Sequence, residues 1–484
     1  MKRSSALVRP FFVPQRPYML FNSVPFLLLV LPTFLLYYTP ALRRYQLHLL
    51  VISSFIFYAW SMPWLLLLLI LSLGINTVAS HAVVYGPEQR RKLYSTLGVV
   101  ANLAILVFFK YSPLIGRTFF PTSGIGEFLV SIPLPVGISF FTFQGISLVV
   151  DAYRGKDIKE YNSIVVKGLW AHTLRISTFI AFFAQLVAGP VVKAHEFLPQ
   201  VRSKYFKDIN WNATFACLVT GYFLKMVVAD NLKDQTFWIT FPYFRDMHSI
   251  TLIVLLFGYS MQIFADFAGY SMIAIGLAHA FGYVLMDNFN FPYISTTFSE
   301  FWRRWHISLS SFLREYLYIP LGGNRKGGFN TYRNLMLTMV LGGLWHGAAW
   351  SYAVWGFFHG LVLALERLVK DLGWGVKLPK VLHMLFIFCM VTLAWLLFKL
   401  PEFSHVIEYM KALVGNTHVV NIQPIILFFT LLFSVPVIIY HLLYLWTRKP
   451  QPTLDRIRPV LYGIMLFLIL VNAGGGASFI YFQF

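Results

Sequence analysis

Apolar runs long enough to cross a lipid bilayer recur along almost the entire chain, and this feature limits the possible folds more than any other. A membrane-spanning helix needs about 20 apolar residues. Runs of about that length lie near residues 20–39, 46–61, 63–84, 94–112, 127–149, 172–192, 213–229, 250–282, 335–365, 381–400, 422–446 and 459–481. The sequence therefore predicts an all-α polytopic membrane protein with about eleven or twelve membrane segments.

The charged residues are few and unevenly divided between the two signs. Only 12% of the residues are charged and 58% are hydrophobic, whereas a soluble domain is about 25% charged. Lys and Arg number 39 against 19 Asp and Glu, an excess that membrane proteins place in their cytoplasmic loops. We assign this excess to membrane topology, with some attraction for anionic membrane lipids and no nucleic-acid partner.

The chain reads as one membrane domain, residues 19–484, behind a basic extension, residues 1–18. The apolar stretch that follows, residues 24–38, lacks the small-residue cleavage site of a signal peptide, so we expect the extension to be a cytoplasmic tail. No internal repeat divides the rest. Cys217 and Cys389 lie far apart in apolar sequence, so neither a disulfide framework nor a metal site is expected.

Two of the apolar runs are unsuited to a single straight span. Residues 132–140 contain two prolines and a glycine, and the backbone groups freed there need partners away from lipid. We expect this segment to be buried against helices or to line a cavity. Residues 335–365 would form a helix of about 46 Å, against a hydrocarbon core of roughly 30 Å. Gly342, Gly343 and Gly347 lie inside this run, so we expect a break, a kink or a steep tilt.

Residues 302–316 are plainly amphipathic when drawn as one helix. One sector of about 100° is apolar, with Trp302, Trp305, Leu309, Phe312, Leu313 and Tyr316, and the opposite sector is polar, with Arg303, Arg304, Ser308, Ser311, Arg314 and Glu315. Thr297 and Glu300 offer a capping box at its start. The simplest interpretation is an interfacial helix that lies on the lipid head groups. His306 sits at the border of the apolar sector, where an imidazole can turn into a cavity.

A second polar feature lies in the run at residues 250–282. Tyr259, Gln262, Asp266 and Tyr270 have helical spacing and share one face. One interpretation is a hydrogen-bonded contact between helices, which is common for Gln and Tyr in membrane bundles. We favour the other, a cavity lining, because an unpaired carboxylate against lipid is expensive.

His346 is the strongest candidate for a catalytic base. It stands between Trp345 and Gly347, near the expected interruption of the run at residues 335–365. An imidazole in such a low-dielectric pocket is held in its neutral form, which accepts protons. No Ser nucleophile elbow and no Cys–His pairing compete with it.

Several motifs together resemble the membrane-bound O-acyltransferases, and in particular the bacterial branch that contains the membrane subunit of alginate O-acetylation. The matching segments are residues 135–140, 188–190, 264–270, 290–293, 301–323, 332–334 and 344–347. The resemblance covers most of the chain. Residues 19–23 match the element at which bacterial members begin, so residues 1–18 have no counterpart.

The resemblance implies a ring of tilted helices around a central funnel, with broken helices and a histidine at the constriction. The two family histidines carry over to His346 and His306. His346 would accept the proton of an attacking hydroxyl, while His306 or a nearby donor supports the oxyanion of the thioester. Arg304 and Asn334 lie in the matching motifs and join Asp266 and its helix face as candidate substrate-binding residues.

The resemblance also implies the reaction and its setting. An acetyl group would pass from cytoplasmic acetyl-CoA, a donor substrate and not a bound cofactor, across the inner membrane to a surface polysaccharide such as alginate, cellulose or peptidoglycan. A periplasmic acetyltransferase would be the partner, and direct transfer and an acyl-enzyme relay both remain open. The alternatives are D-alanyl transfer to teichoic acid from a carrier protein and, in another class, a polysaccharide-related transporter or flippase.

Overall fold

The computed structural model describes residues 18–155, 164–187, 189–375, 378–446, 452–472 and 474, and within these ranges it contains helices and no strand. The fold class predicted from the sequence is confirmed. Nearly all of the predicted extension, residues 1–17, lies outside the described residues, and the treatment of residues 19–484 as one domain stays a prediction.

Seven helices of the described chain are long and apolar enough to cross a membrane, or eight if one bent pair forms a single span. The bent pair consists of α1 (Val24–Tyr38) and the segment Pro40–Ala59, which meet at 107°. The protein is therefore a multi-pass membrane protein. The number is lower than the eleven or twelve expected, because several apolar runs are divided into helices too short to span.

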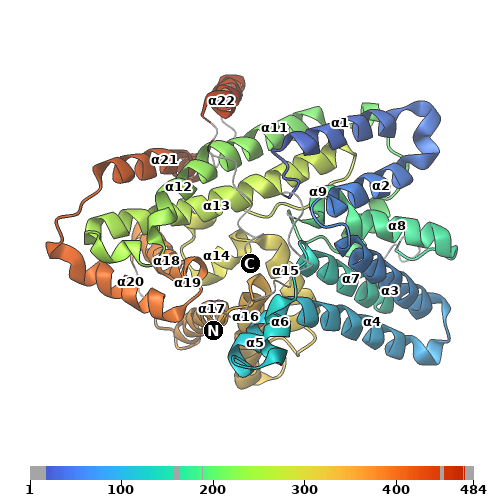
Figure 1. The fold of residues 1–484 in the computed structure, drawn as a ribbon, viewed down its shortest axis with the longest axis horizontal. Helices are drawn as coiled ribbons and strands as arrows, with labels where there is room; N and C mark the ends of the chain where they lie inside the picture. Colours follow the sequence, from blue (N-terminus) through green and yellow to red (C-terminus); the bar gives the residue numbers. More distant parts are fainter. Residues whose placement is uncertain are drawn as a thin grey trace, which may run out of the picture. The chain divides into compact units, whose positions relative to one another are not determined.

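Contacts group the helices into two compact units. Unit 1 extends to Val187 and resumes at Lys193–Phe206, and unit 2 contains the intervening residues and everything from Lys207 onward. The helices of unit 1 are α1, α2 (Gln46–Ala59), α3 (Leu65–Tyr85), α4 (Arg91–Leu106), α5 (Ser112–Phe119), α6 (Gly124–Ser131), α7 (Ile138–Tyr153), α8 (Leu169–Ala181), α9 (Phe183–Leu186) and α10 (Ala194–Phe197) (Figure 1).

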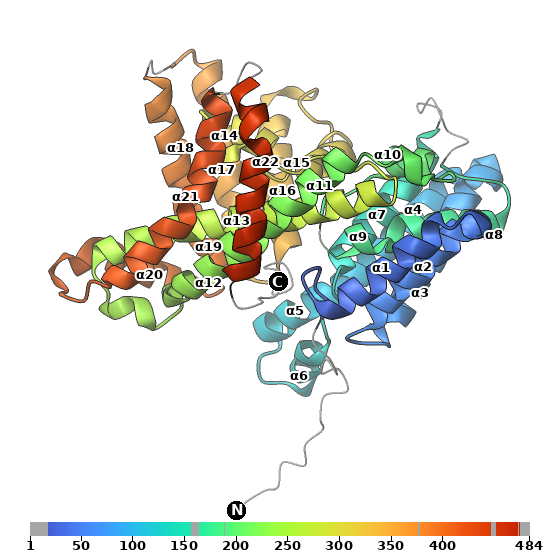
Figure 2. The ribbon, with the colours of Figure 1, turned by 90° about the horizontal axis from the view of Figure 1, so that it is seen from above.

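Unit 2 carries the remaining helices (Figure 2). They are α11 (Trp211–Tyr222), the π-helix η8 (Phe223–Ala229), α12 (Asp230–Thr236), α13 (Ser249–Ala280), α14 (Phe298–Arg304), α15 (Ile307–Leu313), the π-helix η12 (Arg314–Tyr318), α16 (Gly327–His346), α17 (Trp350–Asp371), α18 (Lys380–Ala394), α19 (Leu396–Lys399), α20 (Phe403–Gly415), α21 (Pro424–Trp446) and α22 (Pro452–Val471).

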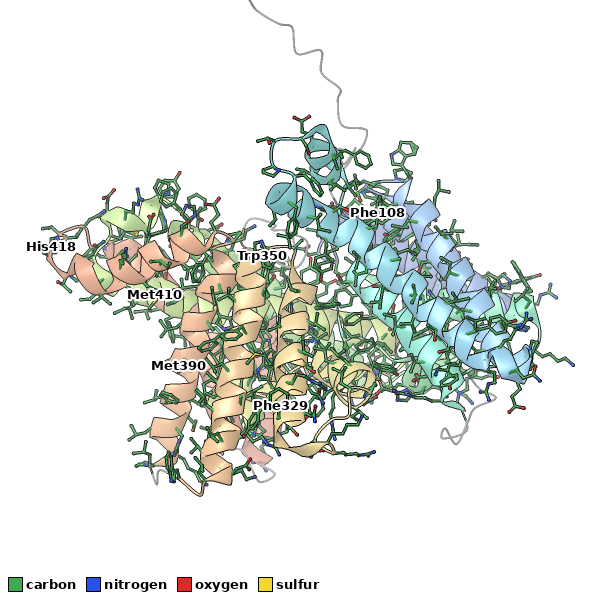
Figure 3. All side chains as sticks on the ribbon, turned by 90° about the horizontal axis from the view of Figure 1, so that it is seen from below. Phe108, Phe329, Trp350, Met390, Met410 and His418 are labelled. Atoms are coloured by element: carbon green, nitrogen blue, oxygen red, sulfur yellow. The ribbon has the colours of Figure 1, made fainter. Side chains whose placement is uncertain are left out.

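The helix α13 is the core of unit 2. It has 32 residues, and helices α11, α12, α20 and α21 pack along it. Large apolar side chains instead point outward on other helices, as Phe329 on α16 and Phe108 of unit 1 show (Figure 3). Exposed apolar surface of this kind suits contact with lipid, and it leaves the interior of unit 2 for polar groups that need partners.

The proline-containing segment of unit 1 separates two helices, in keeping with the expectation that this run is not one straight span. Helix α6 ends at Ser131 and α7 begins at Ile138, after Gly137 with a left-handed φ of 77°. A Cβ at Gly137 would lie 2.5 Å from the backbone oxygen of Leu186. The segment therefore packs against the chain near α9, which is the first of the two arrangements expected for it.

The expected continuous helix over residues 302–316 is wrong. Helix α14 ends at Arg304 and α15 begins at Ile307, with His306 between them at a left-handed φ of 45°. The backbone N–H of Ile307 donates to the carbonyl of Asn288, and the carbonyl of Arg304 accepts from the N–H of Asn290. These bonds use backbone groups that a continuous helix would pair internally, so the break is stabilised from outside.

The predicted start of this stretch is confirmed at Thr297. Its hydroxyl accepts a hydrogen bond from the N–H of Glu300 at 3.0 Å. The Glu300 carboxylate returns to the N–H of Thr296, one residue earlier than an ideal capping box, at 2.9 Å. The start of α14 is thus fixed by local side chains and by Glu366 of α17, which accepts from the N–H groups of Phe298 and Ser299 at 2.6 and 3.3 Å. Its end is fixed by residues 288–290.

Candidate active site

His346 is the last residue of α16, at the interruption that the sequence predicts. Helix α17 begins four residues later, at Trp350. A Cβ at Gly343 would lie 2.2 Å from the backbone oxygen of Tyr352, and one at Gly347 would lie 2.2 Å from the Tyr352 ring. The two glycines therefore let the end of α16 approach the start of α17 closely, and this approach holds His346 in place.

Aromatic rings surround the imidazole of His346. Its ring centroid lies 5.1 Å from those of Trp345 and Phe398 and 5.3 Å from that of Trp355. Only 3% of the residue is exposed, and its Nδ1 is buried. Packing on several sides therefore holds the imidazole of His346 in place where it borders an open space.

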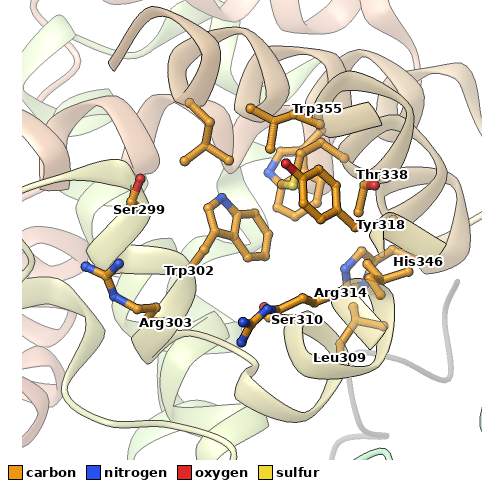
Figure 4. Close-up of a pocket in the computed structure, with 15 residues that line it drawn as sticks. Ser299, Trp302, Arg303, Leu309, Ser310, Arg314, Tyr318, Thr338, His346 and Trp355 are labelled. Carbon is orange, nitrogen blue, oxygen red and sulfur yellow. The ribbon is translucent and has the colours of Figure 1, made fainter. Parts of the chain in front are cut away.

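That open space is a cavity of about 430 Å³ within unit 2 (Figure 4). Its wall is largely apolar, and His346 contributes to it. The lining residues are Ser299, Trp302, Arg303, Leu309, Ser310, Leu313, Arg314, Tyr318, Leu335, Thr338, Met339, Gly342, His346, Trp355 and Leu363. A buried imidazole, two arginines and an apolar wall form a site suited to an anionic ligand with an uncharged reactive end.

His306 lies next to His346 but does not line this cavity. The two ring centroids are 6.0 Å apart, and His306 is 0% exposed. Burial lowers its pKa to about 3, so it is neutral at pH 7. The sequence places His306 where an imidazole can turn into a cavity, whereas the structure buries it beside His346, at a break in the helix that the sequence does not predict.

Asn288 is the residue that holds the His306 ring. Its Oδ1 lies 3.0 Å from Nδ1 of His306 and also accepts from the backbone N–H and hydroxyl of Ser308, at 3.3 and 2.8 Å. Its side-chain N–H₂ donates to the hydroxyl of Ser271 at 3.1 Å. Because the backbone N–H of Ser308 is always a donor, the atom facing it must be the amide oxygen.

The polar face predicted on α13 exists, and its partners are cations and a threonine. Lys225 Nζ lies 2.7 Å from Asp266 Oδ1, 2.6 Å from Asp230 Oδ1 and 5.4 Å from the Tyr270 ring. The other two face residues also contact neighbouring helices. Gln262 accepts a hydrogen bond from the hydroxyl of Thr236 at 2.5 Å, and Lys399 Nζ lies 5.2 Å from the Tyr259 ring. These contacts join helices, as the less favoured interpretation expects, and none of the four face residues lines the 430 Å³ cavity. Their role in substrate binding stays a prediction.

Arg304 and Asn334 also make contacts away from this cavity. Arg304 pairs with Glu300 at 2.9 Å and donates to the carbonyl of Asn290 at 3.0 Å. Asn334 donates to the carbonyls of Leu321 and Gly323, at 3.2 and 3.1 Å, and so closes the glycine turn before α16. Their contact with substrate stays a prediction. In the structure Arg304 bonds to α14 and to residue 290, and Asn334 holds the turn before α16.

Four residues that sequence reasoning did not select occupy the site or its surroundings. Arg303 and Arg314 line the cavity, Asn288 holds His306, and Lys225 pairs with Asp266. Lys225 carried a readable signal, since it is a charged residue inside an apolar run. Asn288 carried none, because its contacts come from a segment 18 residues away.

The part of the chain that the structure describes contains no group of three or more His, Cys, Asp or Glu side chains arranged to hold a metal ion. The histidines near the cavity have aromatic and amide neighbours instead.

Comparison with known proteins places this fold and site in a class. A sequence model of MBOAT, the membrane-bound O-acyltransferase family, matches residues 125–373. The chain is 39% identical over 397 residues to the probable alginate O-acetylase of Pseudomonas putida, covering 79% of this chain and 77% of the relative. It is 34% identical over 393 residues to the peptidoglycan O-acetyltransferase of Helicobacter pylori, covering 76% and 73%. A teichoic acid D-alanyltransferase of Bacillus subtilis is 27% identical over 289 residues, covering 56% of this chain and 70% of the relative.

These matches define a multi-pass membrane acyltransferase. The chain belongs to the membrane-bound O-acyltransferase family, in its alginate O-acetylation branch, which confirms the resemblance seen in the motifs. Family membership favours an enzyme over the transporter or flippase that the sequence left open.

Proposed function

We propose that this enzyme takes an acetyl group from cytoplasmic acetyl-CoA and passes it across the inner membrane for O-acetylation of a cell-surface polysaccharide. Alginate-like polymers, cellulose and peptidoglycan are the acceptor classes, reached directly or through a periplasmic acetyltransferase. The observation that carries the proposal is the 430 Å³ cavity that has both His346 and two arginines in its wall.

In this proposal His346 is the general base. Its unprotonated ring nitrogen takes the proton of the attacking hydroxyl, the hydroxyl oxygen bonds to the acetyl carbon, and the C–S bond breaks. The thiolate of CoA then takes the proton back from the imidazolium, so the histidine ends each cycle neutral. A neutral imidazole suits this role because it can accept a proton near pH 7 and return it.

Arg303 and Arg314 would bind the phosphates of the donor. Both side chains are exposed at the cavity, whereas the neighbouring Arg304 is engaged by Glu300. Guanidinium groups pair with phosphates through charge-assisted hydrogen bonds. The apolar wall beyond them would take the uncharged arm that ends in the thioester.

The relatives divide between O-acetylation and D-alanylation, and the identities favour the first. The D-alanyltransferase match is weaker and covers less of this chain than the O-acetylase and O-acetyltransferase matches. D-alanyl transfer from a carrier protein therefore remains the second candidate. A donor attached to a carrier protein would present a protein surface in place of the nucleotide that the arginines are proposed to bind.

The test is acetyl transfer by purified protein in detergent, with labelled acetyl-CoA and a polysaccharide acceptor. Since a general base contributes about 10²–10⁴-fold, His346→Gln should lose that factor in kcat and still fold. His418→Gln, at an exposed histidine of the segment Asn416–His418, is the matched control and should retain full activity. Parental turnover by folded His346→Gln protein would show that another group is the base.

The donor is tested through the arginines. Arg314→Gln should raise KM for acetyl-CoA by about 10–100-fold, the equivalent of losing a hydrogen bond between charged groups. The same substitution should leave KM for S-acetylpantetheine, which lacks the nucleotide phosphates, unchanged. Equal effects on both donors would mean that Arg314 does not bind the phosphates.

A further inference from the structure

The contacts around His306 determine which of its nitrogens carries a proton. The Oδ1 atom of Asn288 faces the backbone N–H of Ser308, so it is an acceptor, and the opposite side of the amide donates to Ser271. An acceptor 3.0 Å from His306 Nδ1 requires Nδ1 to be the protonated nitrogen. A neutral ring then has no proton on Nε2, which is an acceptor.

This tautomer excludes one role that the sequence suggested. A neutral His306 with its proton on Nδ1 cannot donate a hydrogen bond from Nε2 to an oxyanion. The ring is also 0% exposed and absent from the cavity wall, so it does not meet a ligand there. His306 therefore acts through another residue, and His346 is its neighbour, at 6.0 Å between ring centroids.

His346 has a buried Nδ1 and also lines the cavity. Nε2 of His306 is buried as well, and the two atoms are not hydrogen-bonded to each other in the structure, so a bond between them requires the rings to approach. A donor at Nδ1 of His346 would leave Nε2 of that ring as the base. A base whose other nitrogen is held by an acceptor is the general form of a catalytic triad, and there the acceptor fixes the tautomer and the ring orientation.

We propose that Asn288 is a positioning residue, which holds His306 in the Nδ1–H tautomer so that His306 Nε2 accepts a hydrogen bond from Nδ1–H of His346 during turnover. The chain of acceptors runs from Asn288 through His306 to His346. His306 takes no proton in the reaction, in keeping with the low pKa that its burial gives it. The role at His346 rests on the proposed function, whereas the tautomer of His306 does not.

The tautomer is measured directly by NMR. Protein with ¹⁵N-labelled histidine is reconstituted in lipid nanodiscs, and the His306 signals are identified by their loss in His306→Gln. The ¹⁵N shifts distinguish a ring protonated on Nδ1 from one protonated on Nε2. We expect Nδ1–H in the parent and loss of that preference in Asn288→Leu, which has no acceptor. A parent ring protonated on Nε2 would overturn the proposal.

Kinetics tests the link to the reaction. Asn288→Leu should lower kcat at least about tenfold. The upper limit is ~10⁴-fold, the loss seen when a triad histidine is held in the wrong tautomer. KM for acetyl-CoA should stay near the parental value, because Asn288 lies away from the cavity. Asn290→Ala is the matched control, since the exposed Asn290 meets Arg304 through its backbone. Parental kcat in folded Asn288→Leu protein would overturn the proposal.

Asn288→Asp keeps the test decisive if the Leu variant fails to fold. A carboxylate still accepts from Nδ1 of His306, so the Nδ1–H form and most of the turnover should persist. The added negative charge should favour a charged His306 and move the acid limb of the pH–rate profile upward. Loss of the Nδ1–H form in this variant would refute the role of Asn288. If the parent transfers no acetyl group from acetyl-CoA, the proposed donor is wrong, while the NMR result still decides the tautomer.

Discussion

Two buried polar clusters of unit 2 differ in the interactions that compensate for the loss of water. The histidine cluster, Asn288, His306 and His346, consists of an amide and two imidazoles, and His346 lines the cavity. The lysine cluster, Lys225, Asp230 and Asp266, consists of charged groups bonded to each other. Burying charge is costly unless the charges pair, whereas a neutral imidazole can be buried with one hydrogen bond. In the proposed function the first cluster serves the chemistry, whereas the contacts of the second join helices.

Removing the cation of the lysine cluster should give the largest loss of stability. Lys225→Met leaves two carboxylates buried without their partner, which costs about 3–5 kcal/mol. The melting temperature of the purified protein in detergent should fall strongly, while Lys326→Met, at an exposed lysine, should leave it near the parental value.

Neutralising the remaining carboxylates should reverse much of that loss. Adding Asp230→Asn and Asp266→Asn to Lys225→Met removes the unpaired charges, so the melting temperature should rise again. If Lys225→Met instead melts like the parent and loses its turnover, the lysine cluster belongs to the chemistry and the contrast with the histidine cluster fails.

The histidine cluster should be sensitive to small displacements, and Gly347 offers a way to produce one. Its added Cβ would press on the Tyr352 ring, which packs on Phe398, and Phe398 packs on His346. Because a displacement of about 1 Å can cost 10²-fold in rate, Gly347→Ala should lower kcat by tens-fold with a modest loss of stability.

The matched glycine is Gly328 in the first turn of α16, where an added Cβ meets nothing within 4 Å. Gly328→Ala should keep the parental kcat. Full activity in Gly347→Ala would show that the tyrosine adapts without moving the imidazole.

Features fixed by local sequence could be predicted, and the interruption before Trp350 is an example. The run at residues 335–365 was too long for one span and rich in glycine, so a break near His346 followed from length and flexibility alone. The shared face of Tyr259, Gln262, Asp266 and Tyr270 also followed, because helical spacing fixes it.

Features fixed by distant contacts could not be predicted. The break at His306 depends on backbone bonds from Asn288 and Asn290, and the local pattern of residues 302–316 favours an unbroken helix. The two neighbouring arginines before the break also differ in their contacts. Arg303 lines the cavity, whereas Arg304, the last residue of α14, turns to Glu300 and Asn290. The resemblance named Arg304, whose contact with substrate stays a prediction, and it did not name Arg303, which lines the cavity.

A histidine of unit 1 sharpens the comparison, because its environment acts in the opposite direction. His195 of α10 donates to Asp151 Oδ2 from both its backbone N–H, at 3.2 Å, and its ring Nδ1, at 2.8 Å. This hydrogen bond and the charge of Asp151 raise the pKa of His195 above its usual 6.5. His306 has an amide oxygen as its acceptor instead, and burial keeps it neutral.

The raised pKa fixes the sign of a pH effect on stability. Folded His195 binds its proton more tightly than the unfolded chain does, so the stabilisation is complete below pH 6.5 and is lost as the pH rises through the folded pKa. Since this pair is partly exposed, the effect should be a few degrees in melting temperature at most.

The difference between the melting temperatures of the parent and His195→Gln should therefore be largest near pH 6 and small near pH 9. Asp151→Asn keeps an acceptor for the backbone N–H but removes the charge, so the pH-dependent difference should shrink in that background to the part that Glu196, 4.0 Å from His195 Nε2, supplies. A difference that grows toward pH 9 would mean that the fold holds His195 in its neutral form, as it does His306. The carboxylate and amide partners would then not set the charge of the two histidines.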